Sequence, residues 1–434
     1  MCGITVKKNA FKSLISHRGT KDVSFNAGSW NVVFNSLPLS SYNSGFNQPI
    51  EYKDIKIVFN GEIFNYKKLD RIARSDVHYL SNLIKKLNGD INLLFKESLK
   101  WDGFWSIVYL KDNKLYVFCD PLGKKQMYYS NEGVCSELKG LINSETKINA
   151  YSEKLFGTFE TDFNNLYRFL PATLYCYLYE TDRPYKVQFQ DYFKESETGN
   201  LYDLINESIK TRLENKIDGI SLLLSGGLDS NIIRYHLQKM DIKFESISIE
   251  NNESEIVKRI AEENNMEIKF INTNVNNADL DHLMYHYEHS IDYGSLIPNY
   301  LLFKHCAHHL VLTGDGSDEL FSGYNRALKE DTWNYDTMIE LPYYHNIRID
   351  RMSMAWTKEA RSPLMSLPLM RASRSIKWKD RRGKLILREL YKDKLPDYII
   401  NGVKNPLRLD GNKDKNMESC IDLHRKFWSN YLKK

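Results

Sequence analysis

Residues 225–230, with the sequence SGGLDS, directly follow the apolar run LLL at 222–224. Two glycines let a backbone approach a ligand closely, and a helix that begins after them offers free N–H groups and the positive end of its dipole. The pattern predicts a cradle for phosphate groups. Asp229 suits such an anion site if it holds a magnesium ion that bridges phosphate oxygens. The competing interpretation is a tight Gly-Gly turn that only joins a strand to a helix.

A second group of acids follows another apolar run, in LVLTGDGSDELFSGYNR at 310–326. Asp315, Asp318 and Glu319 lie close together there, at the expected carboxyl end of a strand. Clustered carboxylates suit a metal ion or a cationic substrate group. The competing interpretation is a solvated acidic turn that caps a helix.

The N-terminus holds a third candidate, because Cys2 directly follows Met1. If Met1 is removed, Cys2 carries both a thiol and a free α-amine, and that amine can serve as the base for its own side chain. Taken alone, a cysteine at position 2 is also consistent with chance.

The part of the chain that contains Cys2 is expected to be rich in strands. Up to about residue 190 the chain is rich in short β-branched or aromatic runs separated by turn residues, which predicts strands. These runs are WNVVFNS, IKIVFN, FWSIVYL, KLYVFCD and TLYCYLY. Two helical stretches are expected among them, around 66–87 and near 135–142.

After the polar segment KESETGN at 194–200, helical and strand patterns alternate. A helix over 201–214 precedes the strand GISLLL, and the helix NIIRYHLQKM, the strand FESISIE, the helix SEIVKRIAEENN and the strand EIKFIN follow. This alternation predicts a parallel α/β sheet, and such sheets bind ligands beyond the carboxyl ends of their strands. From about 275 the chain is mainly helical, with one further strand in HHLVLTGDG.

The composition is that of a globular chain of two or three domains, with 434 residues, 42% of them hydrophobic. Its net charge of +4 requires no polyanionic partner. Ten Lys/Arg against three acids at 371–394 predict a solvated or phosphate-facing helical surface, with a nucleic-acid patch as the alternative. Six scattered cysteines, no membrane-length apolar run and no signal-like N-terminus predict a cytoplasmic protein with reduced thiols.

The segment 225–230 resembles the pyrophosphate loop of N-type ATP pyrophosphatases, and 310–326 is similar to the GxGxDExFxGY motif of asparagine synthetases. The stretches DRMSMAWTKEARSPL, GKLILREL and LPDYIINGVKNP resemble the asparagine synthetase family in the same order. The resemblance implies ATP as a substrate with Mg2+. Its implied ATP-binding residues are Leu224, Ser225, Gly226, Gly227, Asp229, Ser230, Ile249 and Gly314. Asp229 and Asp318 would coordinate magnesium. Asp315 would lie at the acceptor amine or adenylate, and Lys404 would stabilise charge in adenylation and amide formation.

The N-terminal stretches MCGI, SHRGTKD, FNGEIFNY, RSD, DGFWSIVY, DPLGKKQMYY and CSELKGL resemble class II glutamine amidotransferases in their order. This resemblance implies that Cys2 attacks the side-chain amide of glutamine and that Asn60 and Gly61 form the oxyanion hole. Glu62 and Asp76 would hold the glutamine ammonium. The competing interpretation of Asn60-Gly61 is a type I′ hairpin turn.

Three positions depart from the family patterns. Ser36 stands in SLPLS where the family has an arginine that clamps the glutamine α-carboxylate, and one hydroxyl cannot replace a bidentate guanidinium. Glutamine would then bind weakly, another cation would substitute, or the substrate would differ. Ser366 replaces the family's usual aspartate, which questions the acceptor pocket. Thr20 replaces a proline, with little expected effect.

The resemblance covers nearly the whole chain and implies a two-domain α/β protein. Residues 2–193 would form an Ntn-hydrolase αββα sandwich, the glutaminase domain. Residues 201–434 would form a parallel-sheet α/β ATP-pyrophosphatase domain with added helices, the synthetase domain.

The leading hypothesis is amidation of aspartate to asparagine through an aspartyl-adenylate, with release of AMP and pyrophosphate and with ammonia from glutamine hydrolysis at Cys2. Ammonia would cross inside the protein, away from water. One alternative keeps this plan with a different carboxylate acceptor, and another is an ammonia-dependent synthetase with weakened glutaminase. The expected partners are glutamine and aspartate or another small carboxylate, with no nucleic acid and no membrane. A homodimer is compatible with the sequence.

A hypothesis of a different class is a metal-binding or interaction protein. Seven side chains motivate it: His282, His286, His289, His305, Cys306, His308 and His309. Such side chains are common ligands of zinc, but their spacing matches no metal signature, and histidines that face a core or solvent are commoner.

Overall fold

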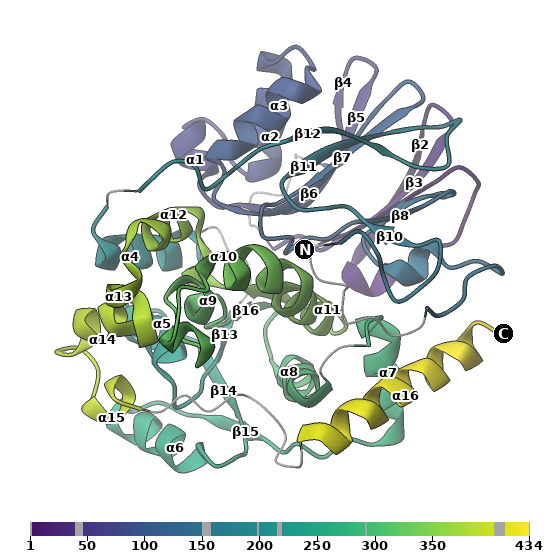
Figure 1. The fold of residues 1–434 in the computed structure, drawn as a ribbon. Helices are drawn as coiled ribbons and strands as arrows, with labels where there is room; N and C mark the ends of the chain where they lie inside the picture. The colour runs from purple at the N-terminus through teal and green to yellow at the C-terminus, as the bar shows by residue number, and fades with distance from the viewer. Residues whose placement is uncertain are drawn as a thin grey trace.

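The computed structural model describes residues 2–39, 47–149, 158–197, 199–214, 219–290, 293–402 and 413–433. The N-terminal half is built on two antiparallel sheets and the C-terminal half on one parallel sheet surrounded by helices (Figure 1). These two halves lie against each other, and the C-terminal helix α16 (Lys413–Tyr431) runs along the side of the molecule.

Each antiparallel sheet has six strands. The first has the order β10 (Tyr167–Arg168), β8 (Tyr128–Ser130), β9 (Gly133–Cys135), β1 (Gly3–Lys7), β3 (Trp30–Ser36) and β2 (Lys21–Ala27). The second has the order β12 (Tyr185–Phe189), β11 (Thr173–Leu178), β7 (Lys114–Cys119), β6 (Gly103–Lys111), β5 (Ile55–Ile63) and β4 (Ile50–Tyr52). The strand runs predicted from sequence all fall on these strands.

The two sheets pack face to face because their strands alternate apolar residues toward each other. Ile4 and Val6 of β1 share one buried cluster with Val58 of β5 and Val108 of β6. The other face of the second sheet is covered by α2 (Asp76–Lys86) and α3 (Ile91–Glu97). On the far side of the first sheet, Trp428 of α16 joins a cluster with residues after β9. The layers therefore follow the predicted order, but part of one outer layer comes from the C-terminal half.

The parallel sheet has the order β15 (Lys269–Ile271), β14 (Glu245–Ile249), β13 (Ile220–Leu223), β16 (Leu310–Leu312) and β17 (Glu359–Arg361). Strands β14 and β15 lie on one side of β13, and β16 and β17 lie on the other. The strand order therefore reverses at the boundary between β13 and β16. Parallel sheets bind ligands at such a boundary, beyond the carboxyl ends of the strands. The predicted strands are all present, and the short strand β17 is one that the sequence did not reveal.

Helices fill the rest of the C-terminal half. They are α4 (Leu201–Thr211), α5 (Leu228–Lys239), α6 (Ser254–Glu263), α7 (Asn277–Tyr287), α8 (Tyr293–His305), α9 (Ser317–Leu320), α10 (Trp333–Tyr335), α11 (Asn346–Met354), α12 (Leu367–Ser375), α13 (Trp378–Arg381), α14 (Leu385–Tyr391), α15 (Asp397–Ile400) and α16. In the part of the chain that the structure describes, none of the helices is both long and apolar enough to cross a bilayer.

Two helix predictions in the N-terminal half were wrong in detail. The stretch 66–87 is split into α1 (Tyr66–Leu69) and α2, because Ser75 caps a new helix by accepting from the His78 N–H. The stretch 135–142 begins at the end of β9 and continues as a 3₁₀ helix over Leu138–Leu141.

Candidate functional site

Cys2 lies at the start of β1, directly beside Asn60 of β5. The backbone N–H of Cys2 donates to Asn60 Oδ1 over 2.9 Å, and Asn60 is fully buried. Asn60 Nδ2 makes no hydrogen bond to any described residue. A buried amide donor without a partner is costly, so this nitrogen is suited to a ligand oxygen. Burial raises the pKa of the Cys2 thiol, so the thiol needs a base before it can attack.

Gly61 lies inside β5, opposite Trp105 of β6, so the interpretation of Asn60-Gly61 as a hairpin turn was wrong. Its φ is +144°, and a Cβ there would lie 2.0 Å from Phe104 O. Only glycine fits that backbone, so the close pairing of β5 with β6 beside Asn60 depends on it.

Glu62 and Asp76 are two carboxylates whose charged forms are both disfavoured. Burial, with the charges of Asp76 and Glu359, raises the pKa of Glu62 well above its ordinary value. Burial also raises the pKa of Asp76 to about 6, although the N–H groups of Ile63 and Val77 donate to its carboxylate and lower it. A cationic ligand such as an ammonium would relieve both acids.

A pocket lies at these acids, and the structure brings three residues of the C-terminal half into it, Thr211, Glu214 and Arg361. Its lining includes Glu62, Asp76, Glu214 and Arg361, the last from β17. Arg361 Nη2 lies 3.5 Å from Glu62 Oε1. Ser36, where the family's arginine is missing, is not among the described residues that line it.

The loop 225–230 follows β13 and leads into α5, as predicted. Ser230 Oγ accepts from the Ser225 N–H over 3.1 Å, and Asn231 donates to the carbonyls of Ser225 and Gly227. The Gly226 N–H donates to Glu253 Oε2 over 3.2 Å. A carboxylate oxygen on this N–H occupies the place that a phosphate oxygen would take. Side-chain hydrogen bonds thus hold the loop in place.

Asp229 and Asp318 converge on one ammonium group. Lys384 Nζ lies 2.5 Å from Asp229 Oδ2 and 2.7 Å from Asp318 Oδ1. Gly323 leaves room for this contact, because a Cβ there would lie 2.0 Å from Asp318 Oδ1. Asp229 Oδ1 makes no hydrogen bond to a described residue. Two converging carboxylates with an unpartnered oxygen fit the donor set that Mg2+ prefers.

Lys384 is a functional candidate that sequence reasoning missed. It is buried, with a side chain 7% exposed, and the charges of Asp229 and Asp318 raise its pKa against the effect of burial. The signal was present, because Lys384 belongs to GKLILREL and to the basic segment 371–394. That segment therefore turns at least one cation toward the predicted phosphate site.

Gly314 lets the loop after β16 lie close against the loop 225–230. A Cβ on Gly314 would lie 3.0 Å from Asp229 Cβ and 3.1 Å from Ser230 N. Asp315 Oδ1 lies 3.8 Å from Arg348 Nη2 and remains partly exposed. Leu224 and Ile249 are buried, so their side chains belong to the core and only their backbone is suited to touch a nucleotide.

The predicted residues of both loops lie at the carboxyl ends of β13 and β16, and Ile249 ends the neighbouring strand β14; parallel sheets bind ligands at this edge. Lys404 lies outside the described residues, so its predicted role stays a prediction. Ser366 begins α12 as its N-cap, where it accepts from the Leu369 N–H over 3.3 Å.

The end of β17 lies between the pocket at Glu62 and Asp76 and the loop that carries Gly314. Arg361 lines the pocket at Glu62 and Asp76, and Ser362 Oγ lies 2.8 Å from Thr313 Oγ1, next to Gly314. Lys124 Nζ, from the N-terminal half, donates to Ser362 Oγ over 3.0 Å. Burial and the charge of Lys125 lower the pKa of Lys124 to about 7. The adjacent residues Arg361 and Ser362 thus contact the pocket and the loop that carries Gly314, respectively.

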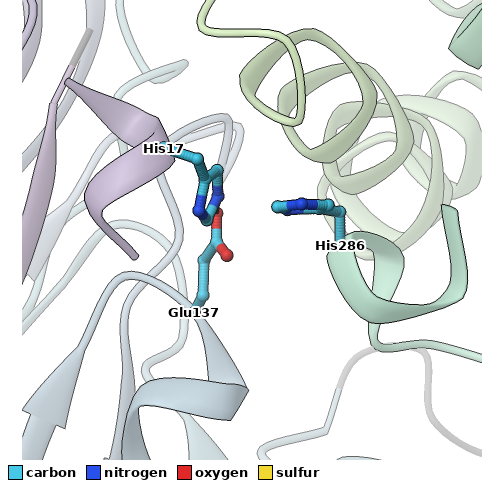
Figure 2. A group of neighbouring side chains, drawn as sticks. All are labelled: His17, Glu137 and His286. Carbon is cyan, nitrogen blue, oxygen red and sulfur yellow. Dashed lines mark hydrogen bonds and ion pairs between the residues drawn. The ribbon is translucent and has the colours of Figure 1, made fainter. Parts of the chain in front are cut away.

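His17, Glu137 and His286 form a further group between the two halves. Figure 2 shows His17 from the 3₁₀ helix Ser16–Arg18 facing His286 from α7, with Glu137 beside them. The ring centroids of the two histidines are 4.2 Å apart, and His17 Nε2 lies 3.1 Å from Glu137 Oε1. Their candidate ligand atoms lie within 4.8 Å of one another, which is close enough for a metal ion.

The charges around Glu137 argue against a metal at this group. Arg18 donates to Glu137 Oε1 over 2.7 Å, Arg351 Nη1 lies 3.2 Å away, and Lys139 pairs with the other carboxylate oxygen. Arg18 also donates to Asp350 of α11 at 3.0 and 3.2 Å. Three cations already pair with Glu137, so a divalent ion would have to displace them from its carboxylate oxygens. We assign the group to a buried ion-pair network that joins the halves.

Of the other histidines of the metal hypothesis, His282 lies against His286, with ring centroids 4.4 Å apart, and its Nδ1 is 3.1 Å from the Tyr300 hydroxyl. His289 Nδ1 lies 3.2 Å from Asp162 Oδ2, and His309 Nδ1 lies 2.8 Å from Thr357 O. Apart from the His17 group, the residues that the structure describes contain no cluster of three or more His, Cys, Asp or Glu arranged for a metal.

Comparisons with known proteins identify both halves. The family model described as asparagine synthase matches residues 200–346 and 337–422, and the model described as glutamine amidotransferase domain matches residues 3–179.

Individual relatives are distant but cover most of the chain. The glutamine-hydrolysing asparagine synthetase 1 of Bacillus subtilis is 26% identical over 72% of this chain and 55% of its own length. The glutamine-hydrolysing asparagine synthetase of Homo sapiens is 26% identical over 81% of this chain and 71% of its own length. Synthetase 1 of Lotus japonicus is 24% identical over 87% and 71%. The chain thus matches little more than half the length of the Bacillus relative. With both family models matched in order, the chain belongs to the asparagine synthase family and carries a glutamine amidotransferase domain.

Proposed function

We propose that this protein amidates a small carboxylate, with aspartate as the leading substrate, at the expense of ATP and glutamine. Glutamine is hydrolysed at Cys2, the carboxylate is activated at the loop 225–230, and ammonia passes between the two sites. The family assignment and the geometry of both sites support this proposal.

At the first site, the Cys2 thiolate attacks the side-chain carbonyl carbon of glutamine. The thiol's raised pKa requires a base, which the α-amine of Cys2 supplies if Met1 is removed. Asn60 Nδ2 and the Gly61 N–H stabilise the tetrahedral oxyanion. The C–N bond then breaks, the proton is delivered to the leaving nitrogen, and water hydrolyses the thioester to glutamate. Glu62 and Asp76 hold the substrate ammonium throughout.

At the second site, the acceptor carboxylate attacks the α-phosphorus of ATP and pyrophosphate leaves. The loop N–H groups and the positive end of α5 bind the phosphates, and Lys384 offsets their charge from between Asp229 and Asp318. Mg2+ held by Asp229 and Asp318 would supply further charge neutralisation. Ammonia then attacks the acyl carbon and AMP leaves. Lys404 is the proposed cation for the charge that develops in these two steps.

The observation that carries the proposal is that the end of β17 contacts both sites. Arg361 faces the glutamine pocket and Ser362 contacts Thr313 beside the adenylation loop, so the two sites meet across buried residues. A buried connection keeps ammonia unprotonated and protects an adenylate from water.

A different acceptor carboxylate is the second candidate. Ser366 supports it, because the family's usual aspartate is absent there and Ser366 is occupied as the N-cap of α12. This variant of the proposal keeps every step and changes only the molecule that is amidated.

The test is release of pyrophosphate from ATP, screened over small carboxylates, with either ammonia or glutamine as nitrogen source. Aspartate should stimulate release, and asparagine should form. If aspartate gives no asparagine while another carboxylate is amidated, the second candidate replaces the first. A Cys2→Ala variant should lose glutamine-dependent turnover and keep ammonia-dependent turnover. If wild-type protein uses ammonia but not glutamine, the glutaminase assignment fails.

A further inference from the structure

The glutamine pocket lacks the cation that its substrate requires. Glutamine carries an ammonium and a carboxylate on one carbon, so a specific site needs an acid for the first and a cation for the second. The acids Glu62 and Asp76 are present, but Ser36 stands where an arginine is expected. The following chain cannot supply the cation, since residues 36–52 contain no lysine or arginine.

One guanidinium nevertheless reaches the pocket. Among the described residues that line it, Arg361 is the single lysine or arginine, and the charged neighbours are Glu62, Asp76 and Glu214. Arg361 comes from β17 of the C-terminal half, so its position in the pocket depends on how the two halves pack.

Arg361 is held in place before any ligand binds. Its Nε donates to Glu359 Oε1 over 2.6 Å, and its Nη1 donates to the carbonyl of Arg212. Its side chain is 4% exposed. Because two of its nitrogens are anchored, the guanidinium loses little further conformational freedom when a carboxylate binds.

The remaining nitrogen points toward the pocket acid. Arg361 Nη2 lies 3.5 Å from Glu62 Oε1, which is longer than a good hydrogen bond. A neighbouring acid and cation match the neighbouring ammonium and carboxylate of an α-amino acid. The pocket has a cavity volume of only about 20 Å³, so glutamine must displace lining side chains and would separate this pair as it enters.

We propose that Arg361 binds the α-carboxylate of glutamine and takes the place of the arginine that is missing at Ser36. The inference rests on the proposed glutaminase function. The glutamine site is then built from both halves, because Glu62 and Asp76 come from one half and Arg361 comes from the other.

The test compares glutamine with 4-aminobutanamide, which keeps the ammonium and the amide but lacks the α-carboxylate. Ammonia release is measured for both, and the ratio of their kcat/KM values reports recognition of the carboxylate. Wild-type protein should prefer glutamine. Arg361→Gln should lower that preference about 10- to 100-fold, mainly through KM for glutamine, because a charge-assisted hydrogen bond to the carboxylate is lost.

Two further variants keep the experiment decisive. Arg361→Lys retains the charge and the pairing with Glu359, so it guards against misfolding, and it should lower the preference less than Arg361→Gln because it lacks the planar fork. Arg74→Gln removes an exposed guanidinium two residues before Asp76 and is the matched control, with the preference expected to persist. Adding Ser36→Arg to Arg361→Gln should restore part of the preference.

The outcomes separate the two proposals. If wild-type protein hydrolyses neither amide, the glutaminase function fails and this inference fails with it. If glutamine is hydrolysed but both Arg361 variants keep the wild-type preference, only this inference is overturned. If Arg74→Gln abolishes the preference instead, the clamp is Arg74.

Discussion

The backbone N–H of Cys2 donates to Asn60 Oδ1 over 2.9 Å, which fixes the amide of Asn60 with its Nδ2 lacking any described partner. One side chain thus positions the nucleophile with its oxygen and presents a donor with its nitrogen. The two tasks need an amide specifically, because a carboxylate would offer no donor and a hydroxyl could not reach both groups.

Asn60→Ala should therefore lower glutamine-dependent turnover about 10²- to 10³-fold, the usual loss for one oxyanion-hole donor. Ammonia-dependent turnover should persist, since the second site does not use Asn60. Steady-state kinetics with each nitrogen source measure this, with Cys2→Ala as the reference for complete loss of the glutaminase. Equal losses with both nitrogen sources would mean that Asn60 supports the fold and not the oxyanion.

Asp76 should impose a pH limit on glutamine use. Its pKa is raised to about 6, so below that pH the acid is protonated and cannot pair with the substrate ammonium. KM for glutamine should rise as pH falls below 6, by up to about tenfold per unit for one controlling group.

The matched variant is Asp76→Asn, which should have a high KM for glutamine at neutral pH and a smaller further rise in that KM below pH 6. Ammonia-dependent turnover, expressed per free ammonia, should not show this loss at acid pH. If KM for glutamine rises in Asp76→Asn as it does in the wild type, another group controls it, with Glu62 the first alternative.

Gly323→Ala should disable adenylation. The added Cβ would lie 2.0 Å from Asp318 Oδ1 and 2.4 Å from Lys384 Cε, so the carboxylate and the lysine cannot both stay in place. ATP–pyrophosphate exchange should fall at least about 100-fold, since misplacement by an ångström has that effect. Glutamine hydrolysis should persist. Gly199→Ala, beside the side chain of Leu204, is the control and should keep the exchange.

The purified protein should contain no stoichiometric zinc. His17, Glu137 and His286 have the separation for a metal, but Arg18, Lys139 and Arg351 already surround the carboxylate. Elemental analysis after exposure to zinc and desalting measures this. One zinc per chain that disappears in His286→Ala would contradict the assignment to an ion-pair network.

The sequence predicted individual strands, loops and helices correctly where these depend on residues that are neighbours in the chain. The run LLL before SGGLDS predicted a strand, a glycine loop and a helix, and β13, the loop and α5 are all present. Strand alternation likewise predicted β3, β5 and β6. The hairpin interpretation of Asn60-Gly61 failed because both a turn and a bulge-free strand accept glycine, and only pairing with β6 decides between them.

By itself, then, the sequence determined the two kinds of sheet, the phosphate loop, the candidate nucleophile and the family resemblance, since these rest on local periodicity and turn chemistry. The tertiary structure alone decided that Lys384 lies between Asp229 and Asp318 and that Arg361 reaches Glu62. β17 is only three residues long, too short for a periodic signal, and its neighbours are set by sheet order and by the packing of the two halves. Contacts between segments far apart in the chain have no local signature, so these placements of Lys384 and Arg361 could be found only in the folded protein.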